Sequence, residues 1–69
     1  MTQDQIQILK EFVLADEEEA ISLLKQHGFL RSNDAIEALE SFLVGSTDYE
    51  IKSVIREKRS LVVLWNKNT

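Results

Sequence analysis

The sequence contains no cysteine, and this absence removes two of the usual supports of a small domain. A chain of 69 residues buries only about 60% of the surface that it exposes when unfolded, so its core is small. Disulfides and thiolate metal sites often stabilise domains of this size, and neither is available here. We therefore expect close helix packing combined with self-association.

The sequence also lacks long apolar runs, and we expect no secretory leader. The chain starts MTQDQIQILKEF, which is polar within its first five residues, whereas a leader has a basic start followed by an apolar stretch. No apolar run approaches the roughly 18 residues that a membrane span requires. Because the lack of cysteine also fits a reducing compartment, we predict a soluble, cytoplasmic protein with no membrane partner.

Residue types that perform catalysis or bind ligands are scarce. His27 is the single histidine, and at the end of a predicted helix the dipole favours its charged form, which indicates a structural role. The run Asp16 to Glu19 lacks the spacing and the central glycine of a calcium loop, and two glycines 17 residues apart form no phosphate loop. We predict no catalytic site, metal site or cofactor, no small-molecule substrate, and a protein that is not an enzyme.

With no proline and only Gly28 and Gly45 as breakers, the chain favours helices. Apolar residues recur at helical spacing, and both glycines stand where a left-handed residue would end a helix. The pattern predicts one domain over residues 1–69, an all-α bundle of four or five short helices near 3–14, 17–27, 34–44 and 48–59. Four cap residues stand three positions before Glu or Gln: Thr2 with Gln5, Asp16 with Glu19, Asp34 with Glu37, and Thr47 with Glu50.

The segment LVVLW, residues 61–65, leaves two interpretations open. If the fourth helix continues to about residue 65, Lys58 interrupts its apolar face, and Val63 and Leu64 fall outside that face. Alternatively, SLVVLW forms a strand that pairs with QIQIL near the start, which would give an α+β fold. On both interpretations more apolar side chains project than the domain can cover, and such a patch is typical of a binding surface.

Charge is distributed unevenly along the chain. Residues 1–50 hold eleven acidic and three basic side chains, whereas residues 51–69 hold five basic and one acidic. Such asymmetry points to electrostatic pairing. Arginine and tryptophan are frequent anchors of interfaces, and a position in the core is the alternative for Trp65. We therefore predict an interaction module, or a small regulator or inhibitor, that binds a protein partner through its C-terminal segment. The predicted partner-binding residues are Arg56, Lys58, Arg59, Val63, Leu64 and Trp65.

The charge distribution also bears on three other hypotheses about the partner: a second copy of the chain, a nucleic acid, and a protein that binds nucleic acid. The acidic first fifty residues of one copy would attract the basic end of another, a head-to-tail form of self-association. Nucleic acid is disfavoured as a ligand because the pI is about 4.8, which weakens long-range attraction to a polyanion. Conversely, Asp16 to Glu19 with Glu37 and Glu40 would allow an acidic decoy that imitates a nucleic-acid backbone.

The stretch LLKQHGFLRSNDAIEAL resembles the helix, Gly-Phe loop and following helix of ubiquitin-associated domains. Gly28, Phe29, Ala38 and Leu39 carry the likeness. In that family the Gly-Phe loop and the last helix contact ubiquitin, so the resemblance implies a ubiquitin-binding module as an alternative. The loop here is longer than the family pattern, a further helix precedes it, and capping explains the same residues, so the family is not assigned.

Overall fold

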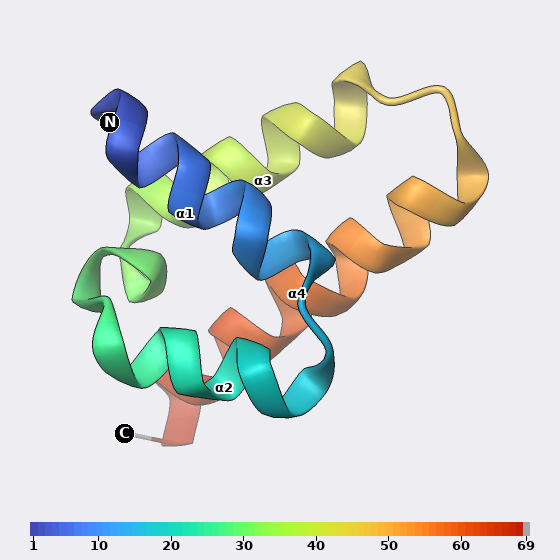
Figure 1. Ribbon diagram of the computed structural model, residues 1–69. Coiled ribbons are helices and arrows are strands. Elements are labelled where there is room, and N and C mark those ends of the chain that lie inside the picture. Colours follow the sequence, from blue (N-terminus) through green and yellow to red (C-terminus); the bar gives the residue numbers. More distant parts are fainter. Residues whose placement is uncertain (69) are drawn as a thin grey trace.

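The computed structural model describes residues 1–68, and regular structure within them is entirely helical (Figure 1). The elements are α1 (Gln3–Leu14), α2 (Glu17–Gln26), the short 3-10 helix η1 (Gly28–Arg31), α3 (Asn33–Gly45) and α4 (Tyr49–Asn68). The predicted all-α bundle is confirmed. The α+β alternative is wrong, because QIQIL lies in α1 and SLVVLW lies in α4.

Helices α3 and α4 form an antiparallel hairpin, joined by a short loop at one end of the molecule (Figure 1). Helix α1 packs on α4 and on α2, and η1 connects α2 to α3 while also contacting α4. Helix α4 thus touches α1, η1 and α3, whereas the main contacts of α2 are with α1 and η1.

The core lies where these elements meet. Each of the four helices and η1 contributes at least one apolar side chain with no accessible surface, as the spacing of apolar residues predicts for an amphipathic bundle. Burial of this apolar surface supplies the main driving force for folding. The largest fully buried side chains are Phe12, Leu9, Leu24, Leu30, Leu39 and Val62.

The first two helix starts follow the predicted capping pattern. The Thr2 hydroxyl accepts from the Gln5 N–H at 3.2 Å, and the Gln5 side chain accepts from the Thr2 N–H at 3.0 Å. The carboxylate of Asp16 accepts from the Glu19 N–H at 2.8 Å. Each bond satisfies backbone donors that the first turn of a helix leaves unpaired.

The caps of α3 and α4 differ from the prediction. Ser32, and not Asp34, is the N-cap of α3. Its hydroxyl accepts from the Ala35 N–H at 3.3 Å and donates to the Phe29 carbonyl at 2.6 Å, which links η1 to α3. Asp48, and not Thr47, caps the start of α4, because its carboxylate accepts from the backbone N–H groups of residues 50 and 51. In both cases a nearby polar residue forms the bond: serine caps as well as aspartate, and aspartate caps better than threonine.

The predicted role of the glycines is wrong. Neither Gly28 nor Gly45 has a positive φ, so neither forms a left-handed helix end. Helix α2 ends at the extended residue His27, after which Gly28 starts η1, and α3 includes Gly45 and ends at the extended Ser46. The fourth helix also passes its predicted end at residue 59 and continues to Asn68, since nothing in residues 59–68 interrupts a helix.

Candidate functional site

Helix α4 carries all six predicted partner-binding residues, but it does not gather them on one surface. At about 100° per residue, the buried side chains Ile55, Lys58 and Val62 share one face of the helix. Of the other five predicted residues, Arg56, Arg59 and Val63 lie together on one side of α4. Trp65 lies next to the buried face and packs against the core, and Leu64 lies on the opposite side. The six residues therefore differ in exposure and in the surface of α4 on which they lie.

Lys58 belongs to the interior. It is 7% exposed and lies between Ile55 and Val62 on the face that packs on the bundle. A lysine tolerates such a place because its four methylene groups can pack against apolar neighbours. No carboxylate among residues 1–68 lies within 4.0 Å of its ammonium group. Lys58 consequently exposes very little surface to a partner.

Trp65 is half-buried and packs against the core cluster. The Cζ atom of Arg31 lies 6.0 Å from the centroid of its ring, a cation–π arrangement. The neighbouring Asn66 donates from Nδ2 to the Arg31 carbonyl at 2.9 Å. This end of α4 therefore holds η1 in place, and Trp65 is at least in part a structural residue.

Val63 and Leu64 are exposed, by 43% and 54% respectively. As consecutive residues of a helix they point about 100° apart, so they do not form one patch. Val63 lies on the side of α4 that carries most of the basic residues, whereas Leu64 lies opposite the buried face.

Four cations follow one side of α4 at spacings of four, three and eight residues. Lys52, Arg56, Arg59 and Lys67 form this row, which we call the basic flank, and Val63 lies within it. Spacings of three, four or eight residues place side chains close together along one side of a helix. The flank thus combines positive charge with an exposed apolar side chain.

Glu40 of α3 meets the basic flank. Its Oε1 atom lies 2.7 Å from a guanidinium nitrogen of Arg59, and both side chains remain substantially exposed. Among residues 1–68 this is the one ion pair within 4.0 Å, so Lys52, Arg56 and Lys67 have no carboxylate that close. A shallow hollow of about 480 Å³ lies here, lined by Glu40, Leu43, Val44, Arg56, Arg59 and Ser60.

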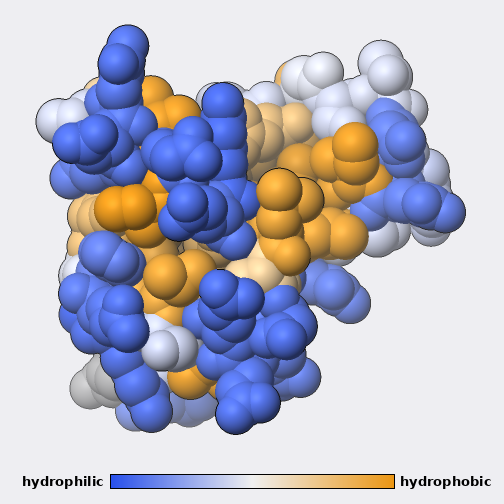
Figure 2. Space-filling model, viewed as in Figure 1, coloured by the Kyte–Doolittle hydropathy of each residue, from blue (hydrophilic) through white to orange (hydrophobic). Residues whose placement is uncertain are grey.

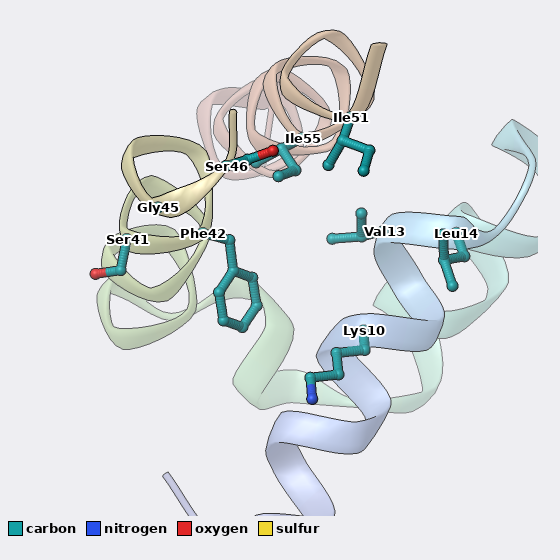
Figure 3. A pocket seen from close by; sticks show the side chains of 9 residues that line it. All are labelled: Lys10, Val13, Leu14, Ser41, Phe42, Gly45, Ser46, Ile51 and Ile55. Atoms are coloured by element: carbon teal, nitrogen blue, oxygen red, sulfur yellow. The ribbon is translucent and has the colours of Figure 1, made fainter. Parts of the chain in front are cut away.

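The structure also contains an apolar groove that the sequence analysis missed. Val13 from α1, Phe42 from α3, and Ile51 and Ile55 from α4 line a hollow of about 450 Å³ (Figure 3). Lys10 is the one charged side chain that lines it. We call this hollow the apolar groove. Figure 2 shows apolar side chains exposed on the face where the end of α1 approaches the start of α4.

Leu14, the last residue of α1, also lines the groove and is 84% exposed. It is adjacent to Val13 but lies about 100° from it around the helix, outside the apolar stripe that faces the core. A leucine outside the stripe, at the last position of a helix, was the available sequence signal. Leu14 and Val13 also border a second hollow of about 800 Å³ between the start of α2 and the middle of α4.

Other candidate sites have little support in the geometry. No group of three or more His, Asp or Glu side chains in residues 1–68 is arranged to hold a metal ion. His27 is half-buried and meets the ring of Phe29 edge to face, with centroids 6.1 Å apart. No helix in this part of the chain has the length and apolar character needed to cross a membrane.

The residues that resemble a ubiquitin-associated domain lie mostly inside. Leu39 is fully buried, and Phe29 and Ala38 pack against the core. Gly28 is exposed at the start of η1. These residues contribute to the packing of η1 and α3 on the bundle, and they form no exposed apolar patch.

Comparisons of the chain with protein-family models, with curated proteins and with solved structures find no match. A function therefore has to be inferred from the surface of the molecule, on which the basic flank and the apolar groove are the two main candidates. Each combines exposed apolar side chains with a hollow.

Proposed function

We propose that the chain is a non-enzymatic interaction module that binds an acidic segment of a partner protein along the basic flank of α4. The observation that carries the proposal is a row of four cations, of which only Arg59 has a carboxylate within 4.0 Å in residues 1–68. Lys52, Arg56 and Lys67 can therefore form ion pairs with carboxylates of another molecule.

The chemistry of the flank indicates the kind of segment that fits. From Lys52 to Lys67 the row extends about 22 Å, the length of four helical turns. The exposed Val63 lies within the row, and Val44 of α3, which is 83% exposed, lies beside Arg56 in the adjacent hollow. A partner helix with carboxylates on one side and small apolar residues beside them would complement both features.

The ion pair between Arg59 and Glu40 supports this choice of partner. It is an example, within the chain, of a carboxylate from a neighbouring helix meeting the flank at 2.7 Å. A protein segment is favoured over nucleic acid because the molecule has a net charge of -4, which opposes the approach of a long polyanion. A short acidic segment is repelled much less.

The test uses charge reversal on the flank with a control of equal net charge. Lys52→Glu with Lys67→Glu reverses two cations of the flank, and Lys10→Glu with Lys25→Glu reverses two exposed cations on α1 and α2. Each immobilised protein is exposed to native cell lysate, and captured proteins are quantified by mass spectrometry. We expect the unaltered protein and the control to retain a common set of acidic proteins that the flank variant loses.

Equal capture by the flank variant and by the unaltered protein would refute the proposal. Elution with salt supplies a second readout, because contacts between exposed charges weaken as ionic strength rises. Truncation after Ser60 is not suitable, since it removes Val62, which is fully buried. Trp65→Ala is unsuitable for the same reason, because Trp65 packs against the core.

A further inference from the structure

Leu14 stands between two hollows at the end of α1. The apolar groove lies on one side, and the larger hollow beside the start of α2 lies on the other. Leu14 is the most exposed large apolar side chain within residues 1–68. An apolar protrusion and an apolar depression therefore lie next to each other on one face of the molecule (Figure 2).

We infer that this face binds a second copy of the chain, in a two-fold symmetric dimer in which Leu14 of each copy enters the apolar groove of the other. A two-fold interface places the same surface patch on both molecules, so the patch must carry both the protrusion and the hollow that receives it. The Leu14 face has both. Val13, Phe42 and Ile51 would surround the incoming leucine (Figure 3).

Acidic and basic side chains near Leu14 would likewise pair with each other across the two-fold axis. The hollow beside α2 is bordered by the acidic Asp16 and Glu17 at the start of α2, and by Arg56, Glu57 and Lys58 from α4. No ion pair joins these groups in the described part of the chain. Because a two-fold axis exchanges the two molecules, a contact of Glu17 with the second copy's Arg56 is formed twice.

This dimer differs from the head-to-tail association that the charge distribution suggests. A head-to-tail contact joins two different surfaces and continues into rings or filaments, whereas the contact through Leu14 closes at two copies. The dimer shares Arg56 with the basic flank, because Arg56 lines the hollow beside α2. Lys52, Val63 and Lys67 do not line either hollow beside Leu14, so the charge reversal at Lys52 and Lys67 leaves the residues of the dimer contact unchanged.

Leu14→Glu tests the apolar part of the inference. Sedimentation equilibrium should show the unaltered protein rising from its monomer mass of 8.0 kDa to twice that mass as concentration increases. Leu14→Glu should remain monomeric up to about 1 mM, the weak end of specific affinity. Its circular dichroism and melting temperature should match the unaltered protein, since position 14 is on the surface.

Val44→Glu is the matched control, because Val44 is as exposed as Leu14 but does not line either hollow beside it. We expect this variant to dimerise as the unaltered protein does. A monomeric mass for the unaltered protein at about 1 mM, the weak end of specific affinity, would overturn the inference. Dimerisation of Leu14→Glu, or equal loss in Val44→Glu, would also overturn it.

A mixing experiment tests the symmetric arrangement. Glu17→Arg and Arg56→Glu should each weaken self-association, because each places like charges opposite one another at both contacts. An equimolar mixture of the two variants restores an opposite-charge pair at both contacts, so dimers should reappear as mixed pairs. A mixture as weakly associated as either variant alone would rule out the two-fold arrangement.

Discussion

Arg31 of η1 lies over the ring of Trp65 of α4, with its Cζ atom 6.0 Å from the ring centroid. The next residue, Asn66, donates a hydrogen bond to the carbonyl of the same arginine. Two consecutive residues near the end of α4 thus hold the connection between α2 and α3. The last turns of α4 are part of the folded domain, and not an appendage that a partner alone would order.

Trp65→Ala should therefore destabilise the domain. The variant loses apolar packing against the core together with the contact with Arg31, and we expect the free energy of unfolding to fall by about 2–3 kcal/mol, somewhat less than for a fully buried tryptophan. Urea denaturation followed by circular dichroism measures the change. Leu64→Ala, one residue earlier and exposed, should change it by less than about 0.5 kcal/mol; similar losses in both variants would contradict the structure.

Asp48→Ala should destabilise the domain more than Thr47→Ala. The Asp48 carboxylate accepts from two backbone N–H groups in the first turn of α4, and removing a cap of this kind costs about 1 kcal/mol. Thr47 is exposed and forms no such bond, so its replacement should be nearly neutral. Thermal melts of the two variants under one buffer condition compare them directly, and the reverse order would show that Thr47 caps the helix.

Gly45→Ala should stabilise the protein. Gly45 has a negative φ, and a Cβ atom added there would meet nothing within 4 Å. Alanine also restricts the unfolded chain, so we expect a gain of about 0.4–1 kcal/mol in the free energy of unfolding. A loss measured by urea denaturation would indicate the left-handed helix end that the sequence suggested.

Lys58→Met should be neutral or stabilising. Methionine keeps most of the buried volume and removes an ammonium group that has no carboxylate within 4.0 Å among the described residues. Lys58→Ala loses the packing of the methylene groups as well, and should lower the free energy of unfolding by about 1–2 kcal/mol. Equal destabilisation by methionine and alanine would mean that the charge itself contributes to stability.

The sequence predicted the helices better than their ends. Periodic apolar residues and the pairs Thr2 with Gln5 and Asp16 with Glu19 located α1 and the start of α2, because both signals are local. The cap at Ser32 was missed because Asp34 is equally suitable, and the choice depends on how η1 is packed. The cap at Asp48 was missed because the pair of Thr47 with Glu50 was preferred, although aspartate is the better cap residue. Local propensity does not contain that information.

The continuation of α4 and the site were harder to predict. Lys58 suggested a break in the apolar face, yet its methylene groups allow burial, so the helix continues. The basic flank depends on the spacing of residues along a single helix. The sequence therefore predicted part of it, namely Arg56, Arg59 and Val63. The apolar groove was not predicted, because it depends on how α1, α3 and α4 are packed together. Of the residues that line it, Leu14 alone carried a sequence signal, since it lies outside the apolar stripe of α1.

The central place of α4 also bears on how the chain is made. Because α4 contacts η1, α1 and α3 and supplies Ile55 and Val62 to the interior, the apolar stripes of the earlier helices stay uncovered until it has emerged from the ribosome. Synthesis adds about 5–20 residues per second, so the 20 residues of α4 alone take about one to four seconds to make. During this time, the stripes of α1 and α3 are open to chaperones and to neighbouring nascent chains.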